Sequence, residues 1–309
     1  MKTLLSALVL SLIPCPASAQ TVGGPPVTPT GNEIKVAVAG YDYVEPGDLR
    51  ISIHGPKFGG EYLGAFVLDR RSHLFTKADA RFTFGNTAYD GWCAPWLITP
   101  NSASPNGYRL GLGVFSPCDD SGNRDWYVEA RGLVGKDVVG KSWTWSPETG
   151  LGVRRLSNSL AGIKGFRKET YLYLPVGLTA RTRVAGQHLL GLNLEFDVLL
   201  RGWQTTYDSA LGSGGIPATP TAPAFTINGF TDLSFEQHRG WAVRASAKYQ
   251  VNKRLSVEPY FLHWRVDDST VSFGPVSFTV NGVTAGQQLG AYEPLNTTRE
   301  FGVKLGIRF

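Results

Sequence analysis

Apolar and polar residues alternate at every second position over long stretches of this chain. In the last stretch Phe301, Val303, Leu305, Ile307 and Phe309 are apolar, whereas the residues between them are small or charged. A period of two places successive side chains on opposite faces of a β-strand. The runs extend over roughly 12 to 18 residues, against about 5 to 6 in ordinary soluble strands. The pattern predicts ten strands, at roughly 34–46, 57–70, 73–88, 124–135, 141–156, 169–182, 187–205, 236–250, 254–268 and 297–309.

One face of each run is apolar and the other carries charges. Between 187 and 204, Leu192, Leu194 and Phe196 share one face, and Glu195 and Asp197 lie on the other. Tilted strands that cross a membrane need about 9 to 11 residues and often extend beyond it. The length of the runs and the chemistry of their faces therefore favour a membrane barrel.

The connections between the runs alternate in length. Short ones lie near 70–72, 135–140, 182–186 and 251–253, and longer ones lie at 47–56, 89–123, 157–168, 206–235 and 269–296. Membrane barrels have short periplasmic turns and long outer loops, so both ends of the barrel lie on the periplasmic side and the strand number is even. The fold class is therefore all-β, an antiparallel up-and-down transmembrane β-barrel of ten strands, with eight or twelve also compatible. A change of phase near Pro259 predicts a bulge in 254–268.

The N-terminal residues indicate export. Lys2 precedes a short apolar run, 4–13, and Ala17-Ser18-Ala19 forms a cleavage site of small residues. We therefore expect a signal peptide at 1–19. A stretch rich in Pro, Gly and Thr follows, which predicts a flexible leader at 20–33 before a barrel at 34–309.

Composition narrows the class of protein further. The chain has 37 Gly residues, 12% aromatic residues and one Met, which suits curved sheets better than helical bundles. The net charge of +5 is not clustered, which argues against nucleic acid as a partner. Cys93 and Cys118 predict one disulfide in an exported chain. Neither has a second Cys or His at ligand spacing, so we expect no metal site, and no cofactor is indicated.

Aromatic residues lie near the predicted strand ends, as interfacial girdles of membrane barrels do. They are Trp126, Trp143, Trp145, Tyr171, Trp203, Trp241 and Trp264. The terminal Phe309, with apolar residues at every second position back to Phe301, is typical of the signal read by the outer-membrane assembly machinery. We therefore expect that machinery, outer-membrane lipid and lipopolysaccharide as partners. The expected location is the cell outer membrane.

Two segments carry a resemblance to known proteins. The stretch from Glu293 through TTREFGVKLGIRF resembles the closing strand of proteobacterial outer-membrane β-barrel proteins of unassigned, porin-like character. The stretch 149–156, followed by Tyr171-Leu172-Tyr173-Leu174-Pro175-Val176-Gly177, is similar to a central hairpin of the same proteins. The resemblance implies location and architecture over most of 57–309, and it brings no catalytic residues with it.

The charged face of the strands supplies a candidate lumen set. Its members are Lys77, Asp79, Arg81, Glu129, Arg131, Glu148, Arg154, Glu195, Asp197, Arg244, Lys248, Glu300, Lys304 and Arg308, with Arg201 and Glu258 on the same alternation. Because buried charges must be paired, mixed signs in a narrow interior predict ladders of ion pairs. This interpretation suits a structural or surface-interaction barrel. A narrow porin whose selectivity is set by these charges is the other interpretation.

Two further classes remain as alternatives. An outer-membrane hydrolase could use Ser157 and Glu169, as a lipid A deacylase would, but Leu156 stands where a His base is expected. An omptin-like protease could use the acidic pairs 119–120 and 267–268 with His263. We therefore predict no catalytic residues. A soluble periplasmic β-sandwich would have to bury its apolar faces against a partner sheet.

Overall fold

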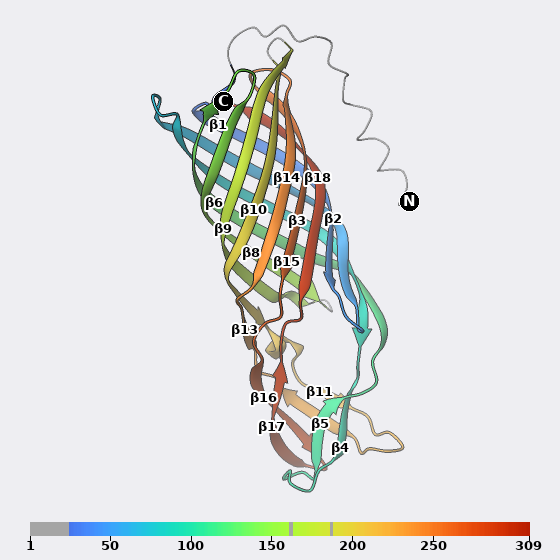
Figure 1. Cartoon of the computed structure of the whole chain (residues 1–309). Coiled ribbons are helices and arrows are strands. Elements are labelled where there is room, and N and C mark those ends of the chain that lie inside the picture. The colour runs from blue at the N-terminus through green and yellow to red at the C-terminus, as the bar shows by residue number, and fades with distance from the viewer. Residues whose placement is uncertain (1–24, 161–162, 186–187) are drawn as a thin grey trace.

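The long strands form one closed antiparallel barrel (Figure 1). The computed structural model describes residues 25–160, 163–185 and 188–309, so the expected signal peptide lies outside the described residues. Within them the ten barrel strands are β1 Gly31–Glu45, β2 Ile51–Asp69, β3 Leu74–Cys93, β6 Ser116–Lys136, β8 Thr144–Leu160, β9 Ile163–Ala185, β10 His188–Thr206, β14 Gly240–Gln250, β15 Leu255–Val266 and β18 Asn296–Arg308. Each pairs with the next along the chain, and β1 closes the ring on β18 with Tyr41 opposite Glu300. The predicted fold class and strand number are confirmed.

Several strands are longer than the pattern predicts. β2 starts at Ile51 rather than at 57, because its first residues pair with β1 as far as Glu45. β3 and β6 remain paired from Leu74 opposite Lys136 to Cys93 opposite Ser116. Two short strands add to the sheet, β7 (Val138–Val139) beside β8 and β13 (Leu233–Gln237) beside β10.

The barrel is apolar outside and charged inside. On β10 the outward side chains of Leu194 and Phe196 are 60% and 46% exposed, whereas the inward Glu195 and Asp197 are 3% and 0% exposed. A soluble β-sandwich would bury the first pair, so this alternative is wrong. An exposed apolar band on a closed barrel requires a lipid environment.

The structure corrects three expectations about facing. A bulge between Leu199 and Arg201 shifts the register on β10, so Arg201 points outward and pairs with Glu236 at 2.7 Å. Tyr171 and Trp264 point inward and are 3% and 1% exposed, so they belong to no outer girdle.

The predicted bulge at Pro259 does not form. β15 keeps one register along β18, in which Pro259 lies opposite Val303. On the other side of β15, the pairing with β14 is interrupted between Val257 and Tyr260, but the register is the same before and after the gap. A proline has no N–H to donate, so it removes ladder bonds on one side and leaves the register unchanged.

Three long connections fold together beyond one end of the barrel (Figure 1). They contain β4 (Trp96–Pro100), β5 (Tyr108–Leu112), the 3-10 helix η2 (Asp208–Leu211), β11 (Gly214–Ile216), β12 (Phe225–Gly229), β16 (Ser272–Val280) and β17 (Val283–Ala291). Strands β11, β12, β16 and β17 form a separate sheet, and β4 and β5 form a hairpin. Long connections mark the extracellular end of such barrels. We call these segments the extracellular module.

The extracellular module has a hydrophobic core of its own. The buried core residues are Ile98, Leu110, Phe225, Ile227, Val276, Phe278, Val280 and Ala285. They come from all three connections, so this core joins segments that lie far apart in the chain. The stretch 212–224, which lies in the second of these connections, is mostly exposed and includes strand β11. No helix among the described residues is long and apolar enough to span a membrane.

A disulfide joins the two barrel strands from which the first of these connections rises. Cys93 ends β3 and Cys118 lies near the start of β6, with their Cα atoms 5.7 Å apart. The bond encloses the hairpin of β4 and β5, so it restrains that hairpin at its base.

Candidate functional site in the barrel interior

The periplasmic half of the lumen contains a chamber of about 230 Å³ lined by charged side chains and by residues 26–32. The predicted leader therefore ends earlier than expected, because Thr28 is 3% exposed and β1 begins at Gly31. The Thr28 hydroxyl donates to Asp137 at 2.8 Å and accepts from Arg181 at 2.9 Å. Arg308 donates to the carbonyls of Pro29 and Thr30, each at 3.2 Å. These bonds hold the N-terminal segment across the periplasmic mouth.

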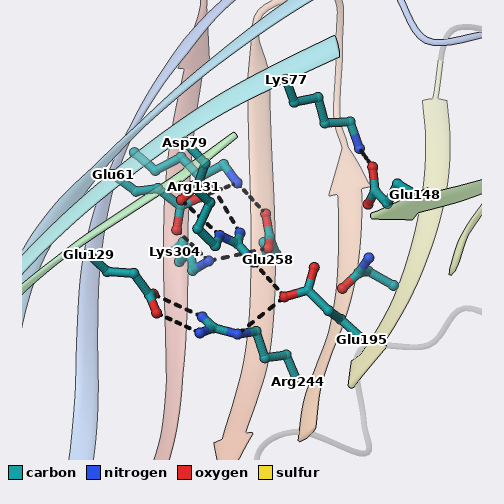
Figure 2. A network of polar contacts seen from close by, with 12 residues as sticks. Glu61, Lys77, Asp79, Glu129, Arg131, Glu148, Glu195, Arg244, Glu258 and Lys304 are labelled. Carbon is teal, nitrogen blue, oxygen red and sulfur yellow. Dashed lines mark hydrogen bonds and ion pairs between the residues drawn. The ribbon is translucent and has the colours of Figure 1, made fainter. Parts of the chain in front are cut away.

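A ladder of ion pairs crosses the chamber (Figure 2). Arg244 contacts Glu129 at 2.5 Å, Asp197 at 2.7 Å and Glu195 at 3.2 Å. Arg131 joins Glu195 at 2.5 Å to Asp79 at 3.1 Å. One guanidinium therefore links up to three carboxylates, and the two arginines share Glu195. Planar guanidinium groups suit such multiple carboxylate contacts.

Lysines continue the ladder on the neighbouring strands. Lys35 contacts Glu61 and Glu258, each at 2.7 Å, and Lys304 contacts the same two carboxylates at 2.6 and 3.5 Å. Lys77 pairs with Glu148, and Lys248 pairs with Glu33. The charges of this half of the lumen are thus mutually neutralised.

The structure places the lumen set predicted from sequence inside the barrel. Lys77, Asp79, Arg81, Glu129, Arg131, Glu148, Arg154, Glu195, Asp197, Arg244, Lys248, Glu300 and Lys304 point inward, and Arg308 lies at the periplasmic rim. Arg201 is the exception, for the reason given above. Phe301, Val303, Leu305, Ile307 and Phe309 face outward along β18, and the structure contains the Cys93–Cys118 disulfide.

Sequence reasoning missed several lumen residues. They are Glu33, Lys35, Lys57, Glu61, Asp125, Asp137, Glu169 and Arg181 on the barrel wall. The predicted leader at 20–33 includes Glu33. In the structure Glu33 and Lys35 share the inward face of β1, and Ile34 and Val36 lie on the outward face. Extending the alternation of the predicted strand 34–46 by one residue toward the N-terminus would have found Glu33.

Densely packed side chains close the lumen at mid-height. Every barrel strand contributes an inward residue with an exposed fraction of 4% or less: Tyr41, Lys57, Arg81, Tyr127, Arg154, Tyr173, Leu199, Ala242, Leu262 and Glu300. A continuous water path would leave its lining exposed. The barrel is therefore closed at this level, as expected when side chains fill a narrow interior. We call these ten residues the mid-lumen layer.

A third cluster lies at the extracellular end of the lumen. Arg167 donates to Glu293 at 2.9 Å and to Glu45 at 3.1 Å, and Gln204 donates to the other oxygen of Glu293 at 2.7 Å. The Tyr43 hydroxyl lies 2.8 Å from Glu45 and 2.9 Å from Glu293, so both carboxylates compete for its one proton. Glu293 belongs to the segment between β17 and β18, and its burial raises the pKa of its carboxyl to about 7. Two carboxylates, Glu45 and Glu293, share the single cation Arg167 in this cluster. The charge of Arg167 therefore only partly offsets the rise in the pKa of Glu293 that burial causes.

The two hydrolase arrangements do not form. Ser157 is buried, and no described histidine bonds to it, while Glu169 accepts a hydrogen bond from Tyr171 at 2.5 Å. His263 points outward and packs edge-on against Trp241. It therefore faces away from the lumen. No group of three metal-ligating side chains occurs in the part of the chain that the structure describes.

No family model matches the chain, and no curated protein does. Among solved structures it is similar to the outer membrane protease OmpT of Escherichia coli, with 13% identity over 94% of this chain and 99% of that one and a TM-score of 0.47. An outer membrane channel of Pseudomonas putida F1 gives 11% identity over 94% and 100%, with a TM-score of 0.37. The translocator domain of the autotransporter NalP of Neisseria meningitidis gives 10% over 91% and 90%, with a TM-score of 0.34.

The placement in the outer membrane follows from the molecule itself, because the closed antiparallel barrel has an apolar outer face, a charged interior and long connections at one end only. Membranes accept β-structure in this closed form, in which every strand edge is paired. The protein is an outer-membrane β-barrel.

Proposed function

We propose that this protein acts as a closed barrel that displays its extracellular module for interaction at the cell surface. The observation that carries the proposal is the mid-lumen layer, in which inward residues from every strand are 4% exposed or less. Such a lumen suits a structural or surface role better than passage of solutes.

The architecture of the extracellular module supports the same proposal. Its three connections share a core, and a groove of about 480 Å³ runs between the β4–β5 hairpin, η2 and the β16–β17 hairpin. Trp96 and Phe230 line it with ring centroids 5.1 Å apart, and Arg109 and Asp208 add opposite charges. A groove of this size with apolar walls and a few polar groups is typical of ligand sites.

Conductance in a planar bilayer tests the proposal. The mature protein is refolded, and heat-modifiable gel mobility checks that the barrel has formed. We expect a folded barrel without stable current steps, because no water path crosses the mid-lumen layer. Steady, salt-dependent steps would overturn the proposal and favour a narrow porin.

The periplasmic chamber favours a second candidate, a narrow channel that opens when the N-terminal segment and the mid-lumen side chains move. Side chains, rather than backbone, block the lumen at mid-height. Residues 26–29, 31 and 32 of the N-terminal segment line the chamber below them. A variant lacking residues 20–30 tests it. Current steps in this variant, absent from the intact chain, would support the channel.

We also propose that lipid and lipopolysaccharide cover the outer face and that the assembly machinery recognises β18. The outward row from Phe301 to Phe309 supports this, with exposed fractions of 49% and 67% at its two ends. Deleting Phe309 is expected to lower the yield of heat-modifiable barrel in cells while refolding in detergent stays unchanged. Equal yields of both forms in cells would contradict recognition.

A further inference from the structure

The mid-lumen layer holds more positive than negative charge. Lys57, Arg81 and Arg154 surround the ring of Tyr127, at 5.5, 5.4 and 4.2 Å from its centroid. The carboxylate among them is Glu300, which contacts Arg81 at 2.8 Å and lies 3.8 Å from Arg154. Two of the three buried cations, Arg81 and Arg154, thus share this carboxylate.

Lys57 lacks the ion pair that other lumen lysines make. Its ammonium lies 3.4 Å from the centre of the Tyr41 ring, and among the described residues it has no carboxylate within 4.0 Å. Lys35 and Lys304 each have two such partners. The two carboxylates that act on Lys57 from farther away are engaged elsewhere, Glu300 by Arg81 at 2.8 Å and Asp125 by Thr87 at 2.8 Å.

Several donors of the mid-lumen layer also lack a hydrogen bond. Among the described residues the Nε of Arg154, the Nε of Arg81 and the hydroxyl of Tyr41 make none, and the Nη2 of Arg154 makes none although it lies 3.8 Å from Glu300. Their side chains belong to residues that are 1%, 4% and 3% exposed. Arginine keeps its proton inside proteins, so its charge persists here. An uncompensated buried cation is costly, and unpaired buried donors add to that cost.

We propose that a small monovalent inorganic anion of the halide class binds between Lys57, Tyr41 and Arg154. An anion offers only acceptor capacity, which is what an ammonium, a hydroxyl and a guanidinium with free N–H groups require. The tightly packed layer favours an ion of atomic size over a phosphate or an organic acid. The proposal concerns the lumen and is independent of any surface role.

Bromide is a direct probe of this site. Crystals of the mature protein grown in sodium bromide are measured at the bromine absorption edge. We expect an anomalous peak beside the Lys57 ammonium and the Arg154 guanidinium. Ordered water at the same donors would give density without an anomalous signal. A well-ordered map with no peak there would overturn the proposal.

A matched pair of variants tests the assignment in solution. Lys57→Met keeps a long unbranched side chain beside the Tyr41 ring and removes one cation of the cluster. Lys248→Met is the control, because it removes a lumen cation that is paired with Glu33. The readout is the midpoint of heat-modifiable mobility in sodium chloride and in sodium gluconate at equal ionic strength.

We expect chloride to raise the midpoint of the intact protein saturably, because a ligand that binds only the folded state stabilises it. Lys248→Met should keep this rise and Lys57→Met should lose it, together with the bromide peak. A rise of equal size in both variants would refute the site. If Lys57→Met does not fold, the bromide peak in the intact protein still decides the question.

Discussion

Arg167 on β9 donates a hydrogen bond to Glu293 at 2.9 Å, and this contact ties the extracellular module to the barrel wall. Glu45, Tyr43 and Gln204 complete the surroundings of Glu293. Glu293 lies between β17 of the extracellular module and β18 of the barrel. A change in the charge of its carboxyl can therefore alter the attachment of the module to the barrel.

The folded position of Glu293 is expected to lose stability as the pH rises, because Arg167 only partly compensates for the ionised carboxyl buried beside Glu45. Burial raises the pKa of Glu293 from 4.5 to about 7, so the folded state binds this proton more tightly than the unfolded state. The stabilisation is therefore fully present below the ordinary pKa and is lost as the pH rises through about 7. Hydrogen exchange of residues 267–295 should be slower, after correction for the intrinsic rate, at pH 5.5 than at pH 8.5.

Glu293→Gln should remove this pH dependence, since the amide stays neutral at both values. The control is Glu236→Gln, which changes an exposed carboxylate paired with Arg201 and should leave the dependence intact. Equal exchange of the intact protein at the two pH values would contradict the role of Glu293.

The two arginines Arg244 and Arg201 should differ sharply in their contribution to stability. Arg244 is 12% exposed at its side chain and contacts three buried carboxylates, whereas Arg201 is 47% exposed and contacts Glu236. Arg244→Met leaves buried charges without a partner and should cost about 3 to 5 kcal/mol. Arg201→Met should cost about 0 to 1 kcal/mol. Urea unfolding in lipid vesicles measures both, and similar costs would argue against the ion-pair ladder.

A charge on the outer face should destabilise the barrel in lipid. Leu194 is 60% exposed on β10 and lies opposite Ala245. Leu194→Arg should cost about 2 to 4 kcal/mol near the middle of the bilayer. Leu211→Arg makes the same change in the extracellular module, where Leu211 is 45% exposed, and should be nearly neutral. Equal free energies of unfolding for the two variants would refute the assigned facing.

Loss of the disulfide should loosen the β4–β5 hairpin and leave the barrel folded. The bond spans a sequence separation of 25, and a loop of this size restrains the unfolded chain by roughly 3 to 4 kcal/mol. The double variant Cys93→Ala, Cys118→Ala should show faster hydrogen exchange at 96–112 with unchanged heat-modifiable mobility. Loss of that mobility would show that the bond holds the barrel itself.

The alternation of residues determined which strands exist and which face of each is apolar. Leu194 and Phe196, or Leu305 and Ile307, could be assigned to the outer face because facing is a local property of a strand with a period of two. The even strand number then followed from the expectation that both ends of the barrel lie on the periplasmic side, because an up-and-down barrel begins and ends on the same side only with an even number of strands.

Tertiary structure decided what no local pattern contains. One extra residue on β10 near Arg201 forms a bulge in its pairing with β9. The bulge reverses the facing that strict alternation predicts for Arg201. Trp264 points inward because β15 keeps its register past Pro259. The partners of Lys57 and Arg244, and the shared core of Ile98, Phe225 and Phe278, join segments far apart in the chain. Such contacts depend on how the strands tilt and close around the barrel, which is a property of the whole sheet rather than of any single strand.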